Sequence, residues 1–154
     1  MEISDLITTT SVRNIYSISS KKRLFQDISE ISSECYSLKS NAVFSGLQER
    51  ELLGSTGVGK GVALPHARIE GLESIIGIFL RIQKPIDFES SDRKPVDLIF
   101  CLMGPVNAGI EHLKALATVS RTMRDPDICT KLRSNDAPAT LFAILTEHSR
   151  SKAA

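Results

Sequence analysis

Apolar residues recur at helical spacing in several segments of the chain. Ser20 has the side chain of an N-cap residue, and the apolar positions behind it, spaced three or four apart, predict a helix. A second helix is predicted over residues 41–53, with Gly54 as its C-terminal stop. Further helices are predicted over 109–124, from Asp125-Pro126 to Leu132, and from Asp136-Ala137-Pro138 onward. The polar tail over 149–154 is expected to fray, and His148 before it is expected on the surface.

Other segments are rich in β-branched and apolar residues, which is typical of strands. Residues 12–18, 62–64 and 75–82 are predicted to be extended. Residues 96–103 are nearly all apolar, as in a strand that is buried on both faces. No internal repeat and no linker interrupts these elements. The pattern therefore predicts one mixed α and β domain over residues 1–154.

Composition excludes several classes of function. The chain has 154 residues, 42% of them hydrophobic, and its 19 Lys and Arg against 18 Asp and Glu leave a net charge of +1. Because the charges are nearly balanced, the protein lacks the positive electrostatic potential that attracts nucleic acid. Aromatic residues make up only 5% of the chain and Trp is absent, so few side chains could stack on bases. No apolar stretch is long enough for a membrane span, and the N-terminus lacks the pattern of an export signal. The three widely spaced cysteines are expected to be free thiols in a cytoplasmic protein.

The run from Gly54 to Arg68 is the most unusual part of the sequence. It contains four glycines within eight residues and ends in Pro65 and His66. Glycine permits tight turns and close approach to the backbone, and proline fixes its own φ and restricts the residue before it. We expect a loop that rigidly presents the imidazole beside bare backbone amides. Such a group suits the uptake and transfer of a phosphoryl group.

The same run resembles a P-loop at first sight. Gly54 and Gly59-Lys60 match the glycines and lysine of that motif, but Gly61 stands where a Ser or Thr should bind Mg²⁺. The run also follows a predicted helix, whereas a P-loop follows a strand and opens a helix. Nucleotide binding is therefore not expected. The plain alternative, that the glycines only make a tight connection, stays open.

Periodicity places two more polar residues on apolar helix faces. Arg50 lies between Val43 and Leu47, and His112 shares a stripe with the apolar residues that follow it in the 109–124 helix. Arg50 is either part of a site or a snorkelling side chain in a surface ion pair. His112 lies in a first turn, where free N–H groups favour an anion. It is either a site residue or a neutral core histidine bonded to a backbone carbonyl. Together with His66, these side chains form a candidate set of two imidazoles and one guanidinium.

These motifs resemble the enzyme IIA domains of the bacterial phosphoenolpyruvate-dependent phosphotransferase system, in the fructose/mannitol and nitrogen-regulatory branch. The likeness covers nearly the whole chain. The sequence shows no fused membrane or carrier segment, so it resembles the nitrogen-regulatory member most. The segments that carry it are 49–57, 61–66, 84–88, 94–100 and 111–116.

The resemblance implies a three-layer α/β/α sandwich around a mixed sheet. It also implies that His66 is phosphorylated on its tele nitrogen, that Arg50 stabilises the phosphohistidine, and that His112 supports the phosphoryl group. In-line phosphoryl transfer needs positioning and positive charge, and here it requires no metal and no cofactor. Lys60 stands where many relatives have Asn, and we expect its charge to lie near His66.

The implied function is that of a phosphohistidine carrier in the cytoplasm. Its donor would be a small phosphocarrier protein of the HPr type, and it would regulate partner proteins, such as transporters or sensor kinases, by its phosphorylation state. Neither nucleic acid nor membrane insertion is expected. Two alternatives stay open. One is a sugar-specific IIA subunit that passes phosphate to a membrane permease, and the other is a binding module of the same fold without phosphorylation.

Overall fold

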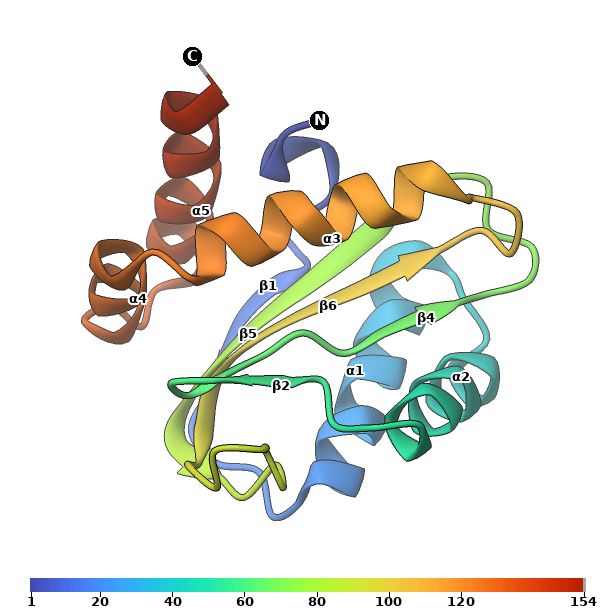
Figure 1. Ribbon diagram of the computed structural model, residues 1–154, viewed down its shortest axis with the longest axis horizontal. Coiled ribbons are helices and arrows are strands. Elements are labelled where there is room, and N and C mark those ends of the chain that lie inside the picture. The colour runs from blue at the N-terminus through green and yellow to red at the C-terminus, as the bar shows by residue number, and fades with distance from the viewer. Residues whose placement is uncertain (154) are drawn as a thin grey trace.

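A mixed sheet of six strands forms the middle layer of the structure, a computed structural model that describes the backbone of residues 1–153 and the side chains of residues 1–147 (Figure 1). Its order is β1-β5-β6-β3-β2, and β4 also pairs with β6. β5 and β6 are antiparallel, as are β2 and β3, whereas β1 runs parallel to β5 and both β3 and β4 run parallel to β6. The strands are β1 (Val12–Ile15), β2 (Gly57–Gly59), β3 (Val62–Ala63), β4 (His66–Arg68), β5 (Ile76–Ile86) and β6 (Val96–Gly104).

The predicted helices are present, with ends within one or two residues of expectation. The Ser20 hydroxyl accepts a hydrogen bond from the Arg23 N–H at 3.1 Å, and the Asp125 carboxylate caps the fourth helix in the same way. The helices over residues 1–153 are η1 (Ile3–Asp5, a 3-10 turn), α1 (Lys21–Tyr36), α2 (Ser40–Leu52), α3 (Ile110–Met123), α4 (Pro126–Arg133) and α5 (Pro138–Ala153).

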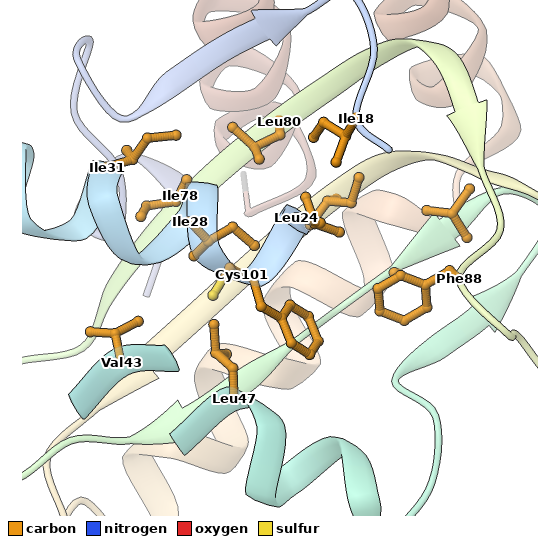
Figure 2. Close-up of a cluster of buried hydrophobic side chains, with 14 of the residues drawn as sticks. Ile18, Leu24, Ile28, Ile31, Val43, Leu47, Ile78, Leu80, Phe88 and Cys101 are labelled. Carbon is orange, nitrogen blue, oxygen red and sulfur yellow. The ribbon is translucent and has the colours of Figure 1, made fainter. Parts of the chain in front are cut away.

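The helices form two layers because successive side chains of a strand point to opposite faces of the sheet. On β5, Ile78 and Leu80 pack against α1 and α2 (Figure 2), whereas Phe79 between them packs toward η1, α3, α4 and α5. β6 is buried on both faces, as its apolar run predicts. The three-layer α/β/α arrangement with a mixed central sheet is therefore confirmed.

Two strands differ in length from the prediction. β1 ends at Ile15 rather than residue 18, and β5 continues from Ile82 to Ile86. The four residues of β1 pair in register with 79–82 of β5, and the register of β5 against β6 then shifts between Arg81 and Ile86. The irregularity includes Pro85, which cannot donate a ladder hydrogen bond. Beyond Ile15, the Lys84 N–H still donates to the Tyr16 carbonyl at 3.0 Å.

The C-terminal tail stays a prediction. α5 is helical through Ala153, but the side chains beyond Glu147 lie outside the described part of the structure. The expected surface position of His148 falls there, and the expected fraying over 149–154 stays a prediction.

Candidate functional site

His66 begins strand β4 at the edge of the sheet. It pairs with Leu102 of β6, and the Leu102 N–H donates to the Pro65 carbonyl at 3.0 Å. The sequence predicted that an extended segment would lead into the histidine and that a loop would present it. The histidine is instead part of a strand, and it is held by a parallel ladder as well as by the proline. The ring is therefore fixed by the sheet, and it stays half-buried.

The hydrogen bonds of the His66 ring define its tautomer. Nδ1 lies 3.0 Å from the carbonyl oxygen of Leu64, and Nε2 lies 3.2 Å from Nε of Arg50. A carbonyl can only accept, so Nδ1 carries the proton, and a guanidinium can only donate, so Nε2 presents its lone pair. The neutral ring thus has its nucleophilic nitrogen at Nε2, the tele position.

Arg50 reaches this nitrogen from the last turn of α2. Its Nη1 also donates to the Gly54 carbonyl at 3.0 Å, which fixes the orientation of the guanidinium. Among the described side chains, no carboxylate forms an ion pair with Arg50. The surface ion pair that was the alternative for Arg50 is therefore absent from this region, and the positive charge beside His66 is left without a neutralising partner.

Glu51 holds the segment that places the Gly54 carbonyl. Its carboxylate accepts from the N–H of Thr56 at 2.9 Å and from the Thr56 hydroxyl at 2.6 Å, and it pairs with Lys21 at 2.6 Å. Sequence reasoning missed this residue. The signal was available, because a carboxylate in the last turn of a helix opposes the helix dipole and needs compensating donors.

His112 lies opposite His66, in the first turn of α3. The centroids of the two rings are 5.9 Å apart, and His112 is only 3% exposed. A Cβ on Gly104 would come within 2.7 Å of His112 Nδ1, so the glycine makes room for the ring at the end of β6.

The buried Nδ1 of His112 has no hydrogen-bond partner among the described residues. The bond to a backbone carbonyl that a core histidine would make from this nitrogen is not seen. A buried lone pair without a partner costs less than a buried N–H without one, so the proton belongs on Nε2. Nε2–H is then the remaining hydrogen-bond donor of this ring.

Both imidazoles are held in their neutral form. Burial lowers the pKa of His66 below its ordinary value of 6.5, and the charges of Arg50 and Arg68 lower it further, while the Leu64 carbonyl and Glu51 oppose the shift. Burial also lowers the pKa of His112, as does the positive charge that His66 carries when it is protonated, and the charge of Arg68 lowers it further. A neutral ring is the nucleophilic form, so the site maintains a reactive His66 at neutral pH.

The glycine-rich run does not form the amide cradle that the sequence suggested. The N–H groups of Thr56, Gly57 and Lys60 already donate to the side chains of Glu51, Ser55 and Asp92. The glycines instead shape the hairpin between β2 and β3, since Gly59 and Gly61 have positive φ values of 94° and 81°. The alternative of a tight connection is the one that the structure supports here.

Lys60 is also placed differently from the expectation. It lies at the tip of this hairpin, and its carbonyl accepts from Nη2 of Arg133. Val62 pairs with Leu98, whereas His66 pairs with Leu102 four positions further along β6, so Lys60 is more than about 13 Å from His66 along the sheet. Figure 1 shows the hairpin tip and the start of α3 at opposite ends of the sheet. The charge of Lys60 is therefore not part of the His66 site.

Arg68 is a second charged residue of the site that sequence reasoning missed. It lies two positions after His66 on β4, and residues two apart in a strand share a face. Its Nη1 donates to the Val106 carbonyl at 3.1 Å. The spacing of two within an extended segment was the signal that could have found it.

No helix within the described residues is long and apolar enough to span a membrane.

Comparison with known families identifies one domain over almost all of the chain. Residues 5–148 match the family described as "Phosphoenolpyruvate-dependent sugar phosphotransferase system, EIIA 2". A nitrogen regulatory protein of Bradyrhizobium diazoefficiens is 43% identical over 145 residues, which are 94% of this chain and 95% of that protein.

Solved structures agree with this result. The crystal structure of nitrogen regulatory protein IIA-Ntr from Neisseria meningitidis has a TM-score of 0.86 and 37% identity, covering 94% of this chain and 99% of that one. The IIA protein in an Escherichia coli complex of enzyme IIA and phosphorylated enzyme IIB for mannitol has a TM-score of 0.74, covering 92% and 99% of the two chains. At 14% identity, that likeness concerns the fold alone.

Proposed function

Because this chain belongs to the EIIA 2 family of the phosphoenolpyruvate-dependent sugar phosphotransferase system, and so is a component of phosphoryl transfer, we propose that it carries a phosphoryl group on Nε2 of His66. The observation that carries the proposal is the hydrogen bonding of this ring. The Leu64 carbonyl holds the proton on Nδ1, and the lone pair of Nε2 faces an arginine with no carboxylate partner among the described side chains. This arrangement combines a neutral nucleophile with local positive charge.

The transfer is an in-line displacement at phosphorus. The lone pair of His66 Nε2 forms the new N–P bond, while the N–P bond of the donor histidine breaks and its electron pair returns to the donor ring. His66 keeps its proton on Nδ1, so the phosphorylated ring is transiently cationic, and the Leu64 carbonyl at 3.0 Å stabilises that charge. The loose transition state spreads negative charge over the equatorial oxygens, where positioned donors have their largest effect.

Arg50 and His112 provide hydrogen-bond donors for the phosphoryl oxygens. The guanidinium of Arg50 gives up its bond to Nε2 when phosphorus approaches, and it then donates to phosphoryl oxygens from the same position. Nε2–H of His112 adds a neutral donor on the other side of the site. The first turn of α3, whose N–H groups lack intrahelical partners, favours negative charge there as well.

The surroundings of the site suit a protein as phosphoryl donor. Several large apolar side chains next to Arg50 and His112 are exposed, and a free small molecule would leave them in water. We propose that a histidine-phosphorylated carrier of the HPr type docks on them, that the reaction takes place in the cytoplasm, and that partner proteins such as transporters or sensor kinases respond to the phosphorylation state. The exposed residues are Leu52, Leu53, Val106, Ile110 and Leu113.

The likeness to nitrogen regulatory proteins favours this role over that of a sugar-specific subunit. The difference lies in where the phosphoryl group goes next. A sugar-specific subunit passes it to a IIB domain of a permease, whereas a regulatory carrier keeps it until it returns to the donor.

The decisive experiment incubates the purified protein with phosphoenolpyruvate, the general enzyme of the system and an HPr-type carrier. Intact mass should increase by one phosphoryl group, which acid should remove. Addition of a IIB domain from a sugar permease should leave the group in place. Rapid transfer to the IIB domain would favour the sugar-specific role, and no uptake from any donor would favour the binding module.

His66→Ala is the matched control for this experiment. The variant should take up no phosphoryl group, and it should melt within a few degrees of the wild type because the ring is only half-buried at a sheet edge. Undiminished acid-labile phosphate on the variant would contradict the assignment of His66.

A further inference from the structure

Arg68 has an unusual combination of charge and contact. It is exposed, and its guanidinium forms no ion pair with any carboxylate among the described side chains. Its one hydrogen bond in this region goes from Nη1 to the backbone carbonyl of Val106, 38 residues later in the sequence. A neutral carbonyl is a modest partner for a guanidinium, which binds anions with bidentate hydrogen bonds when they are within reach.

The bond from Arg68 connects the strand that holds His66 to the loop that begins α3. That loop, residues 105–109, also forms backbone hydrogen bonds of its own. The Ala108 N–H donates to the Pro105 carbonyl at 3.1 Å, and the Glu111 N–H donates to the Ala108 carbonyl at 3.2 Å. Val106 itself is 57% exposed.

The position of Arg68 brings its charge to both imidazoles. His66 and Arg68 alternate with Ala67, whose side chain is buried in the core beneath α1 and α2, so the other two side chains leave the opposite side of the strand. The charge of Arg68 lowers the pKa values of both His66 and His112. A phosphoryl group on His66 would place about two negative charges in this neighbourhood.

We propose that Arg68 is a second phosphoryl-contacting residue, which releases the Val106 carbonyl and binds a phosphoryl oxygen when His66 is phosphorylated. The exchange replaces a bond to a neutral acceptor by a charge-assisted bond. It also frees the 105–109 loop, which carries the exposed Val106 and leads into Ile110. Phosphorylation at His66 is thereby converted into a change of the surface beside the site. This inference rests on the proposed phosphorylation of His66.

Hydrogen exchange tests the proposal on the full chain. The amides of Ala108 and Glu111 report loop opening, and they should exchange about fivefold faster after phosphorylation, because one hydrogen bond of the loop is lost. In Arg68→Gln they should already exchange faster without phosphate, and phosphorylation should add no further increase. Arg121→Gln, which removes an exposed charge from the last turn of α3, is the control and should behave as the wild type.

A second measurement monitors the phosphoryl group itself. Titration by phosphorus NMR should give a higher second pKa for the phosphoryl group in Arg68→Gln than in the wild type and in Arg121→Gln, because a bound guanidinium favours the dianion. Failure of Arg68→Gln alone to accept phosphate, with its fold intact by circular dichroism, would equally support the contact.

The outcomes separate this inference from the function on which it rests. A wild-type protein that takes up no phosphoryl group overturns the proposed function. A wild-type protein that is phosphorylated on His66, but whose loop exchange does not change or changes equally in Arg68→Gln, overturns the role of Arg68 alone.

Discussion

The two ends of the sheet carry arginines in opposite electrostatic situations. At the hairpin end, Arg133 donates to both oxygens of Asp97 at 2.9–3.1 Å and to the Lys60 carbonyl at 2.8 Å, and its hydrogen bonds to Asp97 raise its pKa. At the histidine end, Arg50 and Arg68 donate to a ring nitrogen and to backbone carbonyls, with no carboxylate partner among the described side chains. The first arrangement satisfies a charge within the fold. The second leaves positive charge available for an anionic group from outside.

This difference explains why a count of charged residues did not reveal the site. The net charge of +1 is nearly balanced over the whole chain, but the balance is not local. An arginine with a carboxylate partner has its charge compensated within the fold, whereas an arginine without one can pair with an anion that binds from outside. Substitutions at both ends of the sheet and a change of pH test this contrast.

The largest effect is expected from Arg50→Ala. Phosphoryl transfer to His66 should slow by on the order of 10²-fold, because a positioned donor to the transition state is lost. The free energy of unfolding should change little, since the removed side chain has no ion pair in the described region. Rapid-quench experiments measure the rate of phosphoryl uptake, and urea unfolding measures the free energy of unfolding. A normal rate with a lowered melting temperature would make Arg50 a structural residue.

Arg133→Ala should show the converse behaviour. Removal of the guanidinium leaves Asp97 without its bidentate partner. We expect a loss of about 1–2 kcal/mol in the free energy of unfolding. The loss should be smaller than for a fully buried pair, because solvent screens these partly exposed side chains. The rate of phosphoryl uptake should equal that of the wild type. Thermal melts and the same rapid-quench assay check both statements, and a slowed transfer would show that the two ends of the sheet are coupled.

The two alternatives for His112 can be separated by a pair of variants. If its ring supports the phosphoryl group, His112→Gln retains a donor, and His112→Ala should transfer at least about tenfold more slowly than the glutamine variant. If it is a packing residue, both variants should lose stability and accept phosphate at the normal rate. We expect the first result, because the buried Nδ1 has no partner among the described residues and the ring lies 5.9 Å from His66.

The smallest effect concerns pH. The pKa values of His66 and His112 lie below 6.5 in the folded protein, so the unfolded chain binds protons more readily as the pH falls. Stability should therefore decrease as the pH is lowered through about 6.5, and His66→Gln should reduce the slope. Urea unfolding at pH values between about 7.5 and 5.5, on either side of the ordinary imidazole pKa of about 6.5, measures this slope. A flat profile in the wild type would contradict the depressed pKa values.

Local patterns in the sequence were sufficient for most of the fold. The helix starts at Ser20 and Asp125 depend on side-chain caps within three residues, and the core strand over 96–103 depends on its own apolar run. The mixed sandwich was expected from the family resemblance, and the structure confirms it. The positions of Arg50 and His112 within their helices were also predicted, because helical periodicity is local. His66 was expected on a loop, and the structure places it at the start of β4. Their roles in phosphoryl transfer stay predictions.

What only the tertiary structure decided are the contacts between elements distant in sequence. The glycine-rich run was expected to set bare backbone amides beside His66, and Lys60 was expected near it, but the β2–β3 hairpin carries Gly59, Lys60 and Gly61 toward the other end of the sheet. The guanidinium that contacts Nε2 of His66 comes from Arg50, 16 residues earlier, and the contact of Arg68 is with Val106, 38 residues later. Strand register and loop closure set these distances, and neither is encoded in the residues next to the site. The sequence alone therefore determined which groups were present, and the packing of the sheet determined which of their charges were left without a partner.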